Sequence, residues 1–133
     1  MNVAYDDRGW GAYDLLPVPT GQVNYGYTYE GIVRAFHKHE HQSDNWVCVK
    51  GVLRAVTVHE LPNGEKEIKT TYLREGDGQT LVIPPKVWHG YQPIGGDAAL
   101  VYYVTNTYDP ANPDEERIAW DAFGKELWEV KFK

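Results

Sequence analysis

Turn-forming residues cut the chain into short strand-like runs, and this pattern constrains its fold more than any other feature. Tyr25, Tyr27 and Tyr29 alternate with polar or small residues, which is the period of a β-strand. Pro62-Asn63-Gly64 is a strong hairpin signal. Many short strands at roughly regular spacing predict an all-β sandwich or barrel. After the tyrosine strand, further strand-like runs lie near residues 31–39, 45–50, 52–59, 67–74, 79–84, 87–92 and 98–105.

With 133 residues, the chain is long enough for one core but not for two, so we expect a single domain spanning 1–133. Residues 1–21 are rich in Gly, Pro and Asp and predict an irregular N-terminal arm. Residues 22–109 should form the barrel. In residues 110–133, we expect a short helical turn at 114–116 and a last edge strand over 127–133.

Two segments carry histidines at spacings that bring them together. The first is Gly31-x5-His37-x-His39-x4-Asp44-x6-Gly51, and the second is Gly78-x5-Pro84-x4-His89. Histidines at positions i and i+2 of a strand point to the same face. Because both segments start from glycine and feed inward-facing positions, we predict a double-stranded β-helix of the jelly-roll type. Three imidazoles and a carboxylate inside such a barrel would make either a metal site or a proton-transfer site.

The charge and composition narrow the choice of partner and compartment. A formal charge of −6 and a pI near 5.3 argue against nucleic acid or an anionic membrane as a partner. Apolar runs stay well below the ~20 residues that span a bilayer, and Asp6, Asp7 and Arg8 do not suit a signal peptide. The single cysteine, Cys48, lies in an apolar run and fits a reducing compartment. We therefore expect a cytoplasmic protein.

Several motifs carry a resemblance to a known family. Residues 31–37 read G-I-V-R-A-F-H, similar to a family motif G-V-L-R-G-L-H, and residues 83–91 read I-P-P-K-V-W-H-G-Y, similar to I-P-x-G-x-x-H-G-F. Residues 102–110 and 117–121 follow the later motifs Y-x-T-T-x-Y-Y-x-P and R-G-I-x-W-D. On these motifs, the chain resembles a cupin and, within the cupins, the dTDP-4-dehydrorhamnose 3,5-epimerase family over roughly residues 22–121.

The resemblance implies a cupin jelly-roll barrel that epimerises a dTDP-4-keto-6-deoxyhexose without a cofactor. His37 would be the catalytic base, and Tyr102 the acid on the opposite face of the sugar. The other expected substrate-binding residues are Arg34, His39, Asp44, His89, Asn24 and Trp88. Trp88, with other aromatic residues, could stack on the base or the sugar. His89, His39 or an ordered water would stabilise the enolate oxygen.

Three points depart from the family pattern. The family's lysine downstream of the histidine has no match, because Asp44 takes its place. The carboxylate that orients the catalytic histidine comes late in longer members, beyond the end of this chain, so Asp44 or another acid must fix the tautomer of His37. The third departure is His39, which makes the H-x-H pattern of a second group of relatives. Separately, strict alternation places Arg34 on the opposite face from His37 unless a β-bulge intervenes.

Other functions remain open at this point. The pattern His37-x-His39 also resembles the sugar 3,4-ketoisomerases that act on dTDP-4-keto-6-deoxyglucose. A metal-dependent cupin would bind one divalent ion through His37, His39, Asp44 and His89, a set that suits Mn, Fe, Ni or Zn. A non-catalytic sugar-binding cupin is the third alternative.

The tyrosine stripe at 25, 27 and 29 suits a strand paired with a second subunit, so we expect a homodimer. The acidic run 114–116 suits a solvated surface.

Overall fold

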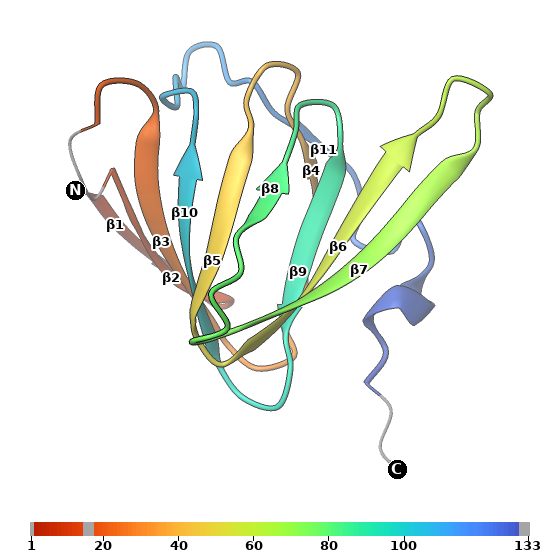
Figure 1. Cartoon of the computed structure of the whole chain (residues 1–133). Coiled ribbons are helices and arrows are strands. Elements are labelled where there is room, and N and C mark those ends of the chain that lie inside the picture. Colours follow the sequence, from red (N-terminus) through yellow and green to blue (C-terminus); the bar gives the residue numbers. More distant parts are fainter. Residues whose placement is uncertain (1, 15–17, 131–133) are drawn as a thin grey trace.

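The computed structural model describes residues 2–14 and 18–130, and nearly all regular structure in them is antiparallel β-sheet. Two sheets face each other, one on the left and one on the right of Figure 1. The first sheet has the order β1-β2-β3-β10-β5-β8, formed by Asn2–Asp6 (β1), Gly9–Tyr13 (β2), Gln22–Thr28 (β3), Ala98–Val104 (β10), Asp44–Lys50 (β5) and Leu81–Ile83 (β8).

The second sheet has the order β11-β4-β9-β6-β7. It is formed by Glu116–Arg117 (β11), Arg34–Lys38 (β4), Trp88–Pro93 (β9), Val52–Glu60 (β6) and Lys66–Arg74 (β7). The chain crosses between the sheets at most steps, as from β4 to β5 and from β9 to β10. This alternation confirms the predicted all-β, jelly-roll type of fold.

Apolar side chains fill the space between the sheets and also cover the outside of the second sheet. The inner cluster includes Trp46, Leu53, Leu73, Ile83 and Leu100, all at most 3% exposed. The outer cluster has Phe36, Val56, Val58 and Trp88 packed against Trp128. Along β6, Leu53 and Ala55 point inside and Val56 and Val58 point outside, so this strand has apolar side chains on both of its covered faces.

The two ends of the chain differ from the prediction. Residues 1–21 were expected to be irregular, but β1 and β2 extend the first sheet, with Tyr5 paired to Trp10 and Trp10 to Tyr27. The prediction of an irregular arm is therefore wrong. The aromatic rings of Tyr5, Trp10, Tyr25 and Tyr27 pack against one another across these strands, and local composition does not reveal such contacts between segments.

At the C-terminal end, a short helical turn is present, but at Lys125–Trp128 rather than at 114–116. Glu116–Arg117 instead forms β11, since it pairs with β4. The expected edge strand over 127–133 is wrong where it overlaps this turn, and residues 131–133 lie outside the described part. In the ranges that the structure describes, no helix is long and apolar enough to cross a membrane.

Candidate active site

Imidazoles from two distant segments meet between the sheets, as the sequence predicted. His37 on β4 and His89 on β9 are direct cross-strand partners, with ring centroids 6.3 Å apart. His39 follows the end of β4, and its ring lies 5.2 Å from that of His89. Thr57 on β6 pairs with His89 from the other side and is also buried. The histidines therefore occupy the inner face of the second sheet.

A β-bulge brings Arg34 to the same face as His37. Arg34 pairs with Tyr91 and His37 with His89, so three steps along β4 match two steps along β9. The extra residue reverses the alternation and turns both side chains inward. Arg34 Nη1 donates to Thr28 Oγ1 at 3.3 Å, which holds the guanidinium near the first sheet. The bulge anticipated as the condition for Arg34 to reach the site is present.

The acid that fixes His37 is Glu115, a residue that the sequence analysis assigned to a solvated surface. Glu115 Oε1 lies 2.6 Å from His37 Nδ1. This hydrogen bond is the largest cause that lowers the pKa of Glu115 from 4.5 to about 2, and Arg117 adds to it. The carboxylate therefore accepts the Nδ1 proton, and Nε2 of His37 is left with a free lone pair.

Glu115 reaches His37 because β11 pairs with β4, with Arg117 opposite His37. The preceding residue, Asp114, fixes the β4–β5 loop: its carboxylate accepts the backbone N–H groups of Glu40, His41 and Gln42 at 2.8, 2.9 and 3.1 Å. The expectation of a solvated acidic run is wrong for both residues. The only sequence signal for Glu115 was its position just before the Arg117 motif, since the pairing partner lies 78 residues away.

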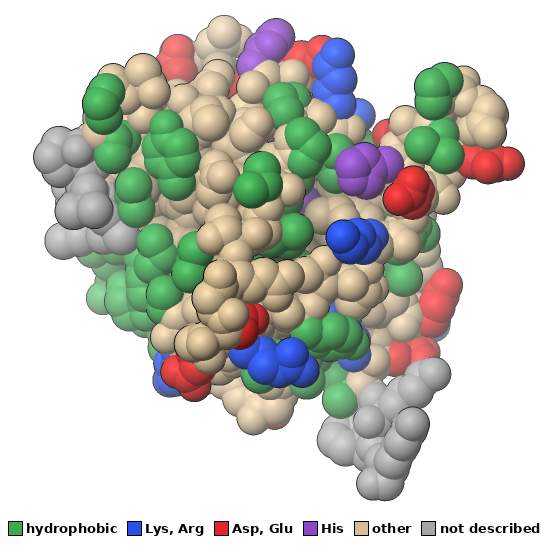
Figure 2. All heavy atoms as spheres, in the orientation of Figure 1, with side chains coloured by type: hydrophobic (Ala, Val, Ile, Leu, Met, Phe, Trp, Pro, Cys, Tyr) green, Lys and Arg blue, Asp and Glu red, His purple; other side chains and the backbone are tan. Residues whose placement is uncertain are grey.

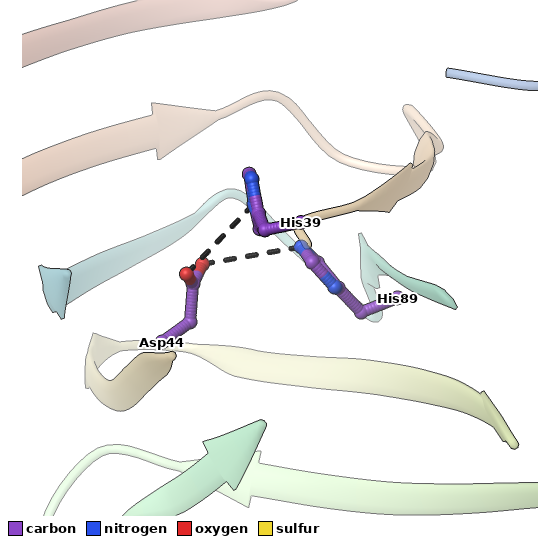
Figure 3. Close-up of side chains that lie close together, drawn as sticks. All are labelled: His39, Asp44 and His89. Atoms are coloured by element: carbon purple, nitrogen blue, oxygen red, sulfur yellow. Dashed lines mark ion pairs between the residues drawn. The ribbon is translucent and has the colours of Figure 1, made fainter. Parts of the chain in front are cut away.

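Asp44 is buried at the start of β5 and contacts the other two histidines instead of His37. Its carboxylate oxygens lie 3.9 Å from Nε2 of His39 and 3.9 Å from Nε2 of His89 (Figure 3). Oδ1 accepts a hydrogen bond from Gln42 Nε2 at 2.9 Å, and Oδ2 accepts one from Trp46 Nε1 at 3.2 Å. Asp44 therefore belongs to the site, but it does not set the tautomer of His37.

His39 and His89 are held by backbone carbonyl oxygens. His39 Nδ1 donates to Asp114 O at 2.6 Å, and His89 Nδ1 donates to Val87 O at 3.0 Å. Burial lowers the pKa of His89 from 6.5 to about 4, although the nearby Asp44 opposes the shift. A neutral imidazole that carries its proton on Nδ1 has only a lone pair on Nε2. In this state His89 accepts a hydrogen bond at Nε2, so the expected donation from His89 or His39 to an enolate stays a prediction.

Tyr102 lies on the opposite sheet from His37. On β10 it pairs with Asn24 of β3 and Trp46 of β5, and all three side chains belong to the inner face of the first sheet. Burial raises the pKa of Tyr102 far above its ordinary value, with Tyr91 adding to the effect. Its hydroxyl thus stays protonated and can act as a proton donor. Asn24 is buried, and its Oδ1 accepts a hydrogen bond from Gln22 Nε2 at 2.8 Å.

Trp88 is not part of this site. It precedes His89 on β9, so its side chain points to the other face of the sheet and packs in the outer cluster. Its Nε1 donates to Glu60 Oε1 at 2.7 Å, and Lys38 Nζ lies 4.5 Å from its ring centroid. The prediction that Trp88 binds substrate is therefore wrong. The inward aromatic residues near the histidines are Trp46 and Tyr91, with ring centroids 5.3 Å apart.

The fold is shared with several solved structures. CapF, a capsular polysaccharide assembling protein from Staphylococcus aureus, superposes with a TM-score of 0.75 at 24% identity, over 88% of this chain but 34% of CapF. NovW, a 4-keto-6-deoxy sugar epimerase from Streptomyces spheroides, gives a TM-score of 0.66 at 23% identity, over 87% of this chain and 65% of NovW. At these identities, the likeness establishes the cupin-like fold alone.

Sequence comparison identifies the family as well as the fold. The chain is 37% identical over 134 residues to the probable low-salt glycan biosynthesis epimerase Agl13 of Haloferax volcanii, covering 91% of this chain and 84% of Agl13. It is 35% identical over 125 residues to the spore coat polysaccharide biosynthesis protein SpsL of Bacillus subtilis, covering 87% and 82%. The family model for dTDP-4-dehydrorhamnose 3,5-epimerase matches residues 2–127. The chain therefore belongs to the dTDP-4-dehydrorhamnose 3,5-epimerase family of sugar-nucleotide epimerases and is an isomerase.

Proposed function

We propose that this isomerase inverts a carbon beside the keto group of a dTDP-4-keto-6-deoxyhexose. The observation that supports the proposal most directly is the hydrogen bond of 2.6 Å between His37 and Glu115. A histidine whose Nδ1 proton is held by a carboxylate presents its Nε2 lone pair as a general base near neutral pH. A carbon acid beside a ketone needs such a base.

The proposed reaction has two proton transfers. His37 Nε2 takes the proton from the carbon beside the keto group, which leaves an imidazolium and an enolate. Glu115 stabilises the imidazolium through its negative charge. Tyr102, on the facing sheet, returns a proton to the same carbon from the other side, which inverts the centre and leaves a tyrosinate. Exchange with solvent then restores His37 and Tyr102 to their starting protonation states.

The choice of substrate draws on both the site and the relatives. NovW is described as a 4-keto-6-deoxy sugar epimerase, and Agl13 and SpsL are described as proteins of glycan and polysaccharide biosynthesis. Within the site, Arg34 supplies a positive charge for an anionic sugar nucleotide, and Trp46 and Tyr91 supply apolar ring faces. Asn24 adds a buried amide on the opposite sheet.

Solvent exchange measured by NMR tests this proposal. In D₂O, the wild type should introduce deuterium beside the keto group of a 4-keto-6-deoxy sugar nucleotide and yield the inverted product. His37→Asn should abolish both processes. Tyr102→Phe should still exchange deuterium but form little inverted product, because the proton returns only from the face of His37.

The other possible outcomes identify the alternatives. Absence of deuterium incorporation by the wild type would refute the epimerase proposal. Movement of the carbonyl from C4 to C3, visible in the carbon spectrum, would assign a 3,4-ketoisomerase instead. Saturable binding of the sugar nucleotide with no isotope exchange would assign a non-catalytic sugar-binding role.

We also infer that the protein is a homodimer that pairs through the outer face of the first sheet. On this face, Tyr5 is 75% exposed and Val82 is 59% exposed, while Val47 and Val49 are also exposed. Figure 2 shows hydrophobic side chains gathered over the strands β3, β10 and β5 of this sheet. A continuous apolar face of this kind favours a protein partner. Sedimentation equilibrium should give twice the chain mass, and Val47→Lys should shift it toward the monomer.

A further inference from the structure

The strand that carries His37 is covered from behind by aromatic side chains. Phe36 directly precedes His37 on β4, yet its side chain points to the outer face of the second sheet and is 0% exposed. Its ring centroid lies 4.9 Å from that of Phe123 and 5.6 Å from that of Trp128, and the first pair of rings is nearly perpendicular. Two rings from the C-terminal segment therefore pack against the residue beside the histidine.

The β4 bulge places two residues of the strand in this outer cluster. Ala35 and Phe36 both pack there. Arg34 and His37, on either side of them, point inward, and the register of the ladder with β9 shifts across this stretch. On the other side of β4, the Phe36 N–H donates to Ile118 O at 3.2 Å, and the Ile118 N–H donates to Phe36 O at 3.1 Å. The C-terminal segment thus pairs with the backbone of the bulge and also packs against its side chains.

Polar contacts fix the position of Trp128. Its side chain is 4% exposed, and its Nε1 donates to Trp120 O at 2.9 Å. Arg54 of β6 donates from Nη1 to Glu129 O at 2.9 Å, so a positive charge caps the end of the helical turn Lys125–Trp128. Figure 1 shows this turn beside the second sheet, on the side away from the first sheet. Trp128 is therefore anchored through its ring and through the backbone that follows it.

The same C-terminal segment also carries the acid that contacts His37. Glu115 Oε1 lies 2.6 Å from His37 Nδ1, while Trp128 packs against the neighbouring Phe36 on the outer face. A displacement of β4 by about 1 Å would stretch the contact with Glu115 beyond hydrogen-bonding range. A misplacement of this size can lower a reaction rate by about 100-fold. The packing on the outer face can therefore control the geometry on the inner face.

We propose that Trp128 is a positioning residue, because its packing against Phe36 holds the β4 bulge in place. The bulge in turn keeps His37 against Glu115 on the inner face. Phe123 contacts the same ring of Phe36 and shares this role. The side chain of Trp128 lies on the outer face of the sheet, so it does not touch the reacting atoms. The effect on the contact between His37 and Glu115 follows from the packing, whereas the effect on turnover rests on the proposed function.

Nitrogen NMR of histidine-labelled protein tests the positioning role without any substrate. The ¹⁵N shifts of the His37 ring report which nitrogen carries the proton, and in the wild type this should be Nδ1, opposite Glu115. Trp128→Ala should redistribute the proton between the two ring nitrogens, whereas Trp128→Phe should retain the wild-type pattern. Leu73→Ala is the matched control and should also retain it. This change removes another fully buried side chain, but from β7, at the edge of the sheet order far from β4.

Steady-state kinetics with a 4-keto-6-deoxy sugar nucleotide connect the packing to turnover. Trp128→Ala should lower kcat about 10- to 100-fold, whereas Leu73→Ala should change it by less than about threefold. In a Glu115→Gln background, Trp128→Ala should lower kcat by less than about threefold, because the contact that it supports is already lost. Phe123→Leu is a milder change beside the same ring and should show the same effects in weaker form. It carries the test if circular dichroism shows that Trp128→Ala does not fold.

The outcomes separate this inference from the proposed function. Folded Trp128→Ala or Phe123→Leu protein with the proton pattern and kcat of the wild type would refute the positioning role. Losses of kcat that multiply when Trp128→Ala and Glu115→Gln are combined would also refute it, since the two residues would then act independently. A redistributed proton in Trp128→Ala, together with a wild type that shows no deuterium exchange, would support the positioning role and refute the epimerase.

Discussion

Replacing Glu115 by glutamine gives the sharpest test of how this site works. The change keeps the size of the side chain but removes the negative charge that faces His37 Nδ1 at 2.6 Å. The amide can present its NH₂ group to the ring, which favours the tautomer with its proton on Nε2 and blocks the base. In the proposed mechanism, the wild-type carboxylate disfavours this tautomer and stabilises the imidazolium that forms during the reaction.

The pKa of Glu115 sets the scale of the effect. It is lowered from 4.5 to about 2, which corresponds to about 3 kcal/mol at 1.36 kcal/mol per unit. Part of this energy comes from Arg117, and the side chain is 23% exposed, so solvent screening reduces it further. We take about 2 kcal/mol as the coupling to His37, which predicts a fall in kcat of about 30-fold. Loss of the correct tautomer would enlarge the effect.

Steady-state kinetics with a 4-keto-6-deoxy sugar nucleotide measure this change. KM should stay within about threefold of the wild-type value, because Glu115 contacts the imidazole and not the substrate. Glu116→Gln is the matched control, since Glu116 follows Glu115 directly, at the start of β11, but its side chain is 64% exposed. Activity of Glu115→Gln within threefold of the wild type would refute the role of this carboxylate.

Further predictions concern stability and the bulge. Trp88→Phe should lower the free energy of unfolding by about 1–3 kcal/mol, because the indole N–H bond to Glu60 is lost, and should leave KM unchanged; a raised KM at unchanged stability would return Trp88 to the substrate site. Gly90→Ala should destabilise the fold by a similar ~1–3 kcal/mol and lower kcat/KM, because the new Cβ would lie 2.9 Å from Ala35 Cα in the bulge; thermal melts like the wild type's would contradict this. Since the pKa of Glu115 is lower in the folded state, its stabilisation is complete above pH 4.5 and is lost as the pH falls toward 2. The difference in melting temperature between wild type and Glu115→Gln should therefore shrink from pH 6 to pH 3, and a constant difference would argue against the pairing.

The local pattern of the sequence determined most of the strands and the face that each side chain occupies. Of the alternating tyrosines, Tyr25 and Tyr27 lie on β3 and Tyr29 lies just beyond its end, and the Pro62-Asn63-Gly64 signal lies in the hairpin between β6 and β7. The spacing of His37, His39 and His89 predicted that their rings meet, and they do. The alternation of side chains along a strand could also have excluded Trp88 from the site, because a residue next to an inward-pointing histidine points outward.

Contacts between distant segments were decided only by the tertiary structure. Glu115 becomes the partner of His37 because β11 joins β4, and the two residues are 78 positions apart. The N-terminal strands extend the first sheet because Trp10 stacks on Tyr25 and Tyr27. The tautomers of His39 and His89 depend on carbonyl oxygens, which every residue has. Periodicity reports the face of a strand, whereas strand pairing and backbone hydrogen bonds depend on which segments meet in space.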